Sequence, residues 1–301
     1  MLDQQVIDAM MPIYSDNYAI VDNKNAQQLQ AKEAIDEAYE KIRASIHARS
    51  DDKFATFTSS DEAHIRLLLE IYMNKILTGQ KNNIILSATE SDVIYDTAQY
   101  LAEQGCRINI VPLNKEGIID LEMLKDIITQ KTALVSITMV DSTSGAIMPI
   151  DEVVQICKEN EVPLHSDATH AIGKIPIDIQ MLDLDYMSFS TETMHGPSGL
   201  ALLYIKNGME LNNLIVPMHS RSEIIGMGKA LELAADAQAF EMEDVRELRD
   251  KLEESIRQID NHVIITSWAY RVPNTIVAGF KDVYSDALIW ELAKAGISVD
   301  S

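Results

Sequence analysis

Apolar positions along this chain alternate between helical and strand spacing. Between residues 26 and 47 they recur every three to four residues, with Ile35, Ala38 and Ile42 on one face, which predicts an amphipathic helix. Short, wholly apolar runs such as "NIILS" and "TALVSITMV" separate this helix from further helical segments and predict buried strands. This order of elements indicates an α/β fold, with a mainly parallel sheet covered by helices on both faces.

The pattern changes after Gly226. Apolar positions then fall at helical spacing as far as Ile259, which predicts one long or broken helix. Its charged face, "EMEDVRELRDKLEES", is typical of a solvated surface with internal ion pairs, and a partner surface is the alternative. The runs "HVIITSW", "NTIVAGF" and "SDALIWELAKAG" then predict two strands and a helix, which form a separate α+β unit.

Composition and charge narrow the possible functions. Of the 301 residues, 47% are hydrophobic and 24% are charged, as in an ordinary globular protein. The net charge of −22 disfavours nucleic acid and anionic membrane surfaces as partners. No apolar run reaches the roughly 18–20 residues of a membrane helix. The N-terminal segment contains Asp3 and Asp8 and does not begin with basic residues, so we expect no signal peptide and a cytoplasmic location.

Two cysteines occur, Cys106 in a helix-to-strand turn and Cys157 in the apolar stripe of "DEVVQICKEN". Neither adjoins basic residues that would lower a thiol pKa. Both are therefore interpreted as buried small hydrophobic residues rather than nucleophiles. A disulfide is not expected in a reducing compartment.

The most informative segment is "HSDATHAIGKIPIDIQMLDLDYMSFSTETMHGPSGLALLYIKNG". It resembles the cofactor-binding core of NifS/IscS-type cysteine desulfurases, which are class V aminotransferases with the runs D-A-x-Q-x-x-G-K-x-P, S-F-S-x-H-K and G-P-x-G. Further matches in the same order, including "GIIDL", "RVPNT" and "ALIWELAKAGI", extend the resemblance from Leu2 to Ser301. It implies fold type I of the pyridoxal phosphate (PLP) enzymes, with a mainly parallel seven-stranded sheet in the large domain. We expect that domain at 15–255, and a truncated small α+β domain at 1–14 with 256–301.

The resemblance also places the functional positions of the family on this chain. Family members need a lysine for a Schiff base with PLP, a carboxylate at the pyridine nitrogen, and donors for the phosphate. Asp167 stands at the carboxylate position and Ser190 at a phosphate position, and His170 replaces a glutamine beside the phenolic oxygen. Thr193 replaces the Schiff-base lysine, so no catalytic residue is assigned. Asp167, His170 and Ser190 are the remnant of the cofactor site.

The phosphate side departs further from the family pattern. The family's T-S-G-A-T-E turn reads as residues 58–63, with Asp61 and Glu62 among them, and Glu192 replaces a phosphate-binding histidine. Three carboxylates near one phosphate would repel it. Ser91 replaces the histidine that stacks on the ring, and the R-S-G-T loop is shortened to "HSRSEII".

Two other required groups are missing. The N-N-E-x-G loop begins with Asp141 in place of the asparagine that holds the cofactor, and "GISVDS" ends before the family's nucleophilic cysteine. The nearest lysines, Lys174 and Lys206, match family positions away from the aldehyde and are not expected to replace the lost amine. We therefore expect no cofactor.

These departures leave three hypotheses. The first is a non-catalytic structural or regulatory paralogue linked to iron–sulfur or sulfur-transfer metabolism, which forms a homodimer or a heterodimer with a desulfurase-fold subunit and contacts an iron–sulfur scaffold protein. The second is an enzyme with changed chemistry in the former cofactor pocket, or with residual PLP-dependent activity. The third is a decaying gene copy, against which the intact hydrophobic periodicity argues. For the second, a zinc-like ion has candidate ligands, although their spacing matches no recognised metal motif: His165, Asp167, His170, Glu192, His195 and His219.

Overall fold

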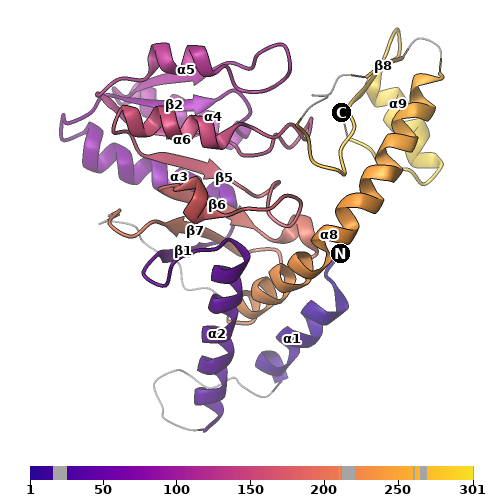
Figure 1. Cartoon of the computed structure of the whole chain (residues 1–301), viewed down its shortest axis with the longest axis horizontal. Helices are drawn as coiled ribbons and strands as arrows, with labels where there is room; N and C mark the ends of the chain where they lie inside the picture. The colour runs from indigo at the N-terminus through magenta and orange to yellow at the C-terminus, as the bar shows by residue number, and fades with distance from the viewer. Residues whose placement is uncertain (16–25, 210, 212–220, 260–261, 265–269, 301) are drawn as a thin grey trace.

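A seven-stranded sheet forms the centre of the protein in this computed structural model, which describes residues 1–15, 26–209, 211, 221–259, 262–264 and 270–300 (Figure 1). The strand order is β1-β7-β6-β5-β4-β2-β3. β7 runs antiparallel to both of its neighbours, and the other pairs in the sheet are parallel. The predicted mainly parallel, seven-stranded α/β fold is confirmed. The strands are β1 (Lys53–Phe57), β2 (Asn83–Ser87), β3 (Arg107–Val111), β4 (Thr132–Ser136), β5 (Leu164–Asp167), β6 (Tyr186–Ser190) and β7 (Ala201–Ile205).

Helices cover both faces of this sheet, as Figure 1 shows. β2 illustrates the two-sided core, because Ile84 and Leu86 enter the cluster packed by α3 and α4, whereas Ile85 enters the cluster on the opposite face. All three side chains are buried. The helices are α1 (Gln4–Ser15), α2 (Ala26–Ser45), α3 (Ser60–Ile71), α4 (Asp92–Glu103), α5 (Leu121–Ile127), α6 (Ile150–Glu159), α7 (Ile179–Leu182), α8 (Arg221–Arg257) and α9 (Ser285–Lys294), with a π-helical turn η1 (Tyr72–Ile76) and a 3-10 turn η2 (Glu192–Met194).

The helix α8 is continuous over 37 residues, so of the two alternatives from the sequence the long helix is the one observed. Its first half packs against α1 and α2, and its far end reaches the hairpin of β8 (His262–Ile264) and β9 (Ala278–Phe280) (Figure 1). α2 and α8 approach so closely that a Cβ on Gly228 would lie 3.0 Å from the Ala38 backbone. This close approach explains why the position has no side chain.

The C-terminal elements differ from the sheet in their packing. The two-stranded β8-β9 sheet and α9 follow the predicted strand, strand, helix order. None of the side chains of α9 is buried, and Trp290 is 65% exposed. The proposed domain boundaries, 15–255 against 1–14 with 256–301, stay a prediction.

Three local features complete the fold. β1 was not expected, because its five residues alternate too briefly to be recognised, and its place is set by antiparallel pairing with β7. Cys106 and Cys157 are both buried as predicted, and burial raises the pKa of their thiols to about 11 and about 12. No helix in the described part of the chain has the length and apolarity needed to cross a membrane.

Candidate functional site

Asp167 ends β5, where the carboxyl ends of the parallel strands meet. Its Oδ1 accepts a hydrogen bond from the Thr169 backbone amide at 2.9 Å, and its Oδ2 accepts one from the Ser188 hydroxyl at 2.6 Å. Ser188 lies on the neighbouring strand β6 and is fully buried, so the carboxylate is held from two elements. These contacts fix the side chain at the edge of the sheet, where ligands of open α/β folds bind.

A line of buried polar side chains continues from Ser188 into the core. His165 Nε2 lies 3.1 Å from Ser188 Oγ, and His165 Nδ1 lies 2.7 Å from Ser136 Oγ. Ser136 Oγ is in turn 2.8 Å from His64 Nε2. His64, Ser136, His165 and Ser188 are all buried, so each hydrogen bond replaces lost contacts with water. We refer to these four residues as the buried polar chain.

The direction of the hydrogen bonds in the buried polar chain follows from the donors available. Ser188 donates its single hydroxyl proton to Asp167, so it must accept from His165 Nε2. A neutral His165 then has an unprotonated Nδ1, which accepts from Ser136, and Ser136 accepts from His64 Nε2. Every donor therefore points toward Asp167. The polar chain supports a negative charge on that carboxylate.

The pKa shifts agree with neutral imidazoles. Burial lowers the pKa of His64 to about 3, and burial together with the nearby His64 lowers that of His165 well below its ordinary value. Burial also raises the pKa of Asp167, against the hydrogen bonds from Ser188 and Thr169.

Glu90 lies at the far end of this line, on the loop before α4. Its Oε2 is 3.8 Å from His64 Nδ1, within ion-pair range, and its Oε1 accepts from the Ser87 hydroxyl at 2.7 Å. Burial, opposed by the Ser87 hydrogen bond and reinforced by the charge of Asp167, raises the Glu90 pKa to about 8. The side chains of Glu90 and His64 are both fully buried, and both pKa shifts favour the uncharged form of the side chain. The contact is therefore a neutral one at pH 7.

The phosphate side of the site is arranged around the start of α3. Ser59 caps this helix, accepting from the Glu62 amide at 3.1 Å. The carboxylate of Glu62 turns back, and its Oε2 accepts from the Thr58 amide at 2.9 Å and the Thr58 hydroxyl at 2.6 Å. A carboxylate of the chain itself thus occupies donors at a helix N-terminus, where the helix dipole attracts anions.

The other two acidic replacements are also bound within the site. The Ser91 hydroxyl donates to Asp61 Oδ1 at 2.8 Å, which joins the starts of α3 and α4. The Ser190 hydroxyl donates to Glu192 Oε1 at 3.3 Å. The hydroxyl of Ser190, at a phosphate position of the family pattern, therefore bonds to a carboxylate of this chain.

Thr193 lies in η2, directly after β6. Its hydroxyl donates to the Thr169 carbonyl at 2.9 Å, which ties the turn to the segment after Asp167. His170 lies half-buried on that segment, and its pKa is lowered first by burial and then by the charge of Lys174. The structure thus brings Asp167, His170 and Thr193 into one region.

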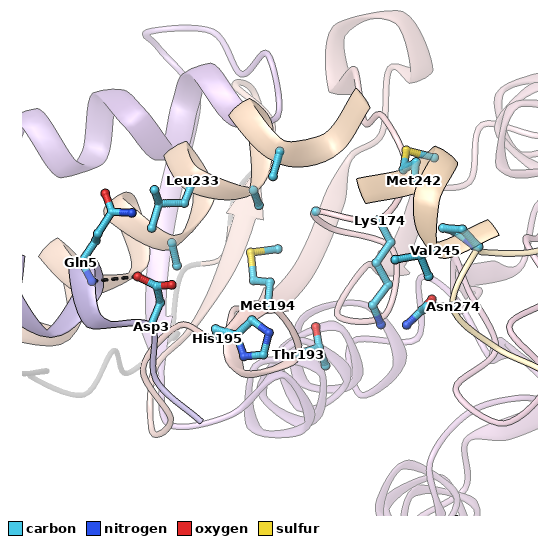
Figure 2. Close-up of a pocket in the computed structure, with 15 residues that line it drawn as sticks. Asp3, Gln5, Lys174, Thr193, Met194, His195, Leu233, Met242, Val245 and Asn274 are labelled. Atoms are coloured by element: carbon cyan, nitrogen blue, oxygen red, sulfur yellow. Dashed lines mark hydrogen bonds between the residues drawn. The ribbon is translucent and has the colours of Figure 1, made fainter. Parts of the chain in front are cut away.

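The two lysines nearest in sequence have different surroundings. Lys206 forms ion pairs with Asp183 at 2.7 Å and Asp185 at 3.6 Å, away from this region. Lys174 lines a cavity of about 420 Å³ together with Thr193 (Figure 2). This cavity was not predicted from the sequence, because its walls come from five separate segments. They are Asp3, Gln5, Gly173, Lys174, Thr193, Met194, His195, Ala230, Leu233, Ala234, Ala237, Met242, Val245, Pro273 and Asn274.

The metal hypothesis gains no support from the described residues. Both ring nitrogens of His165 are hydrogen-bonded within the buried polar chain, and His195 Nδ1 lies 2.9 Å from the Met1 carbonyl. No group of three or more His, Cys, Asp or Glu side chains in the described part of the chain could hold a metal ion. His219 lies outside the described residues.

Comparison with known proteins identifies the family. The class-V aminotransferase family matches residues 1–218. The cysteine desulfurase IscS of Clostridium botulinum (strain Kyoto / Type A2) is 30% identical over 306 residues, which cover 97% of this chain and 76% of that protein. The cysteine desulfurase NifS of Azotobacter vinelandii is 25% identical, over 100% of this chain and 77% of that protein. A solved NifS-like protein superimposes with a TM-score of 0.93 at 26% identity, covering 100% and 84% of the two chains. The chain belongs to the NifS/IscS cysteine desulfurase family of class-V aminotransferases.

This membership corrects the expectation that the chain takes no cofactor. The family and the fold are those of PLP enzymes, so PLP is the cofactor to expect. The expectation was wrong because it treated the replaced Schiff-base, stacking and phosphate positions together as loss of binding. Binding of such a cofactor is spread over many non-covalent contacts, and the covalent bond is one among them.

The site fits PLP on one side only. Asp167 offers a held carboxylate to the ring nitrogen, which fits the electron-sink chemistry that PLP supplies when bound. On the other side, Glu62 and Glu192 occupy the donors of Thr58 and Ser190, and these carboxylates repel a phosphate while they are ionised. We therefore derive no reaction step through the cofactor in this chain.

Proposed function

We propose that this protein is a desulfurase homologue that does not release sulfur from cysteine and that serves as a structural or regulatory partner in sulfur-transfer metabolism. The observation that carries the proposal is the hydroxyl of Thr193 at the Schiff-base lysine position. It donates to the Thr169 carbonyl, and a hydroxyl cannot form the covalent bond that an amine forms with an aldehyde.

The two thiols, of Cys106 and Cys157, are buried. A persulfide-forming cysteine has to be accessible and to have a low pKa. Cys106 and Cys157 are the two cysteines of the chain, and both are buried with raised pKa values. Neither has the properties of a sulfur acceptor.

A non-catalytic role requires a partner. We propose a homodimer, or a heterodimer with a desulfurase-fold subunit, and an iron–sulfur scaffold protein as a further contact. The preserved sheet and its buried polar chain support a role that depends on the fold. Native co-purification followed by mass spectrometry tests this: recovery of a desulfurase subunit or of the same chain supports it, and a monomer without partners contradicts it. The cytoplasmic location predicted from the sequence stays a prediction.

Sulfide release from L-cysteine, with PLP and a thiol reductant present, tests the loss of activity. We expect wild-type protein to match a protein-free control that contains PLP. The informative variants are Thr193→Lys alone and Thr193→Lys combined with Glu62→Thr and Glu192→His, which also restores the phosphate side. The triple variant should show covalent PLP after borohydride reduction, whereas the wild type should show none. Sulfide release by the wild-type protein above the control would overturn the proposal.

A further inference from the structure

Lys174 presents a half-buried amine to the cavity between α8 and the turn after β5. Asp167, His170 and Ser190 do not line this cavity, so it differs from the former cofactor site although Thr193 borders both. Figure 2 shows the amine of Lys174 and the amide of Asn274 turned toward the same part of the cavity, with Thr193 nearby. No hydrogen bond or ion pair joins Lys174 Nζ to a side chain among the described residues, apart from the electrostatic influence of His170.

The cavity is lined by apolar side chains as well as polar ones. Eight of the lining residues are apolar, mostly from α8: Met194, Ala230, Leu233, Ala234, Ala237, Met242, Val245 and Pro273. Gly173 lets the turn approach this wall, because a Cβ there would lie 2.4 Å from Met194 Cε and its φ is +74°. Removal from water disfavours an ammonium more than a neutral amine, and burial accordingly lowers the pKa of Lys174. Partial removal of a lysine amine from water makes it a better nucleophile.

The surroundings favour an uncharged ligand over an anion. Asp3 supplies a carboxylate at the other end of the cavity (Figure 2), and the whole chain carries a net charge of −22. Both repel anions. His170 and His195 are the other titratable groups nearby, and His195 is already bonded to the Met1 carbonyl. An apolar carbonyl compound therefore fits better than a carboxylate or a phosphate ester.

We propose that this cavity binds small apolar aldehydes and that Lys174 forms a Schiff base with them. The lone pair of Nζ adds to the carbonyl carbon, a C=N bond replaces the C=O bond, and the carbonyl oxygen leaves as water with the two amine protons. The exchange needs no oxidant or reductant. The amide of Asn274 is placed to donate to the carbonyl oxygen as the amine adds. This site goes beyond the proposed function and does not depend on PLP.

Reductive trapping on the full chain, without PLP or cysteine, tests the proposal. Butanal at a concentration near that of the protein is added with cyanoborohydride, and the modified lysines are located by peptide mass spectrometry. Lys206 is the matched control, because it is similarly half-buried but is paired with Asp183 and Asp185. We expect Lys174 to be modified several times faster than Lys206. Equal rates at the two lysines would overturn the proposal.

Two further experiments distinguish the contribution of the cavity from the reactivity of Lys174 by itself. Ala234→Leu fills the cavity without changing Lys174 and should slow the modification of Lys174 by butanal several-fold. An unchanged rate in this variant, with an unaltered urea unfolding curve, would contradict the site. Glyoxylate, an anionic aldehyde, should modify Lys174 more slowly than butanal, and the reverse order would contradict an apolar site. The trapping assay uses wild-type protein without PLP or cysteine. A negative result in it therefore does not change the interpretation of the sulfide-release test.

Discussion

The pyridine side and the phosphate side of the cofactor site differ in how they are tied to the rest of the molecule. On the pyridine side, Asp167 is held by Ser188, and the polar chain behind it runs through the core as far as His64. On the phosphate side, Glu62 and Glu192 bond to neighbours only a few residues away along the chain. The comparison teaches that groups built into the core persist, whereas groups needed only by a ligand change freely.

The largest effect that would test this comparison comes from His165→Leu. The substitution removes both imidazole contacts, so that Ser136 loses the acceptor and Ser188 loses the donor that His165 provides in the core, which should lower the free energy of unfolding by about 3 kcal/mol. Urea unfolding followed by circular dichroism measures it. Glu62→Gln is the matched control on the phosphate side and should cost less than about 1 kcal/mol. Equal losses at the two positions would remove the distinction.

The pH dependence of stability gives the next effect. Because the pKa of Glu90 rises from 4.5 to about 8 on folding, its protonated form is favoured in the folded state. Its contribution is therefore complete below about pH 4.5 and is lost as the pH rises through 8. The pKa of His64 falls from 6.5 to about 3, so its contribution is complete above pH 6.5 and is lost as the pH falls toward 3.

Urea unfolding at a series of pH values checks these signs. Between pH 6 and pH 8 we expect the wild type to lose on the order of 2 kcal/mol. Glu90→Gln stays uncharged and should flatten this alkaline decline while leaving the acid decline in place. An alkaline decline of the same size in the variant would show that another group causes it.

Substitutions on the two sides of the site should change the affinity for PLP in opposite directions. Asp167→Asn removes the charge that pairs with the ring nitrogen and should weaken non-covalent binding by about tenfold, the equivalent of about 1.4 kcal/mol. Glu62→Thr frees the donors of Thr58 for a phosphate and should strengthen binding. Equilibrium dialysis with PLP measures both, and pyridoxal without phosphate is the control ligand, which Glu62→Thr should leave unaffected. If Glu62→Thr weakened PLP binding, the carboxylate would not be what opposes the phosphate.

The sequence predicted the fold better than the site, for physical reasons. Helical periodicity located α2 within residues 26–47, and the apolar runs "NIILS" and "TALVSITMV" located β2 and β4, because burial imposes a pattern on neighbouring positions. The buried polar chain was not predicted, since His64 and His165 are 101 residues apart and meet only through the order of the strands. Lys174 was considered only as a replacement for the Schiff-base lysine, because the apolar wall from α8 is invisible to local patterns.

The smallest expected effect belongs to Glu192→Gln, and it sharpens the comparison most directly. Glu192 is exposed and bonds to the Ser190 hydroxyl at 3.3 Å, a contact that a glutamine oxygen can still accept. The free energy of unfolding should change by less than about 0.5 kcal/mol. A larger loss in urea unfolding, compared with the similarly exposed Glu122→Gln, would mean that the phosphate side also supports the fold. Its acidic residues would then be structural elements, retained for stability, and their presence would say nothing about how the site binds a phosphate.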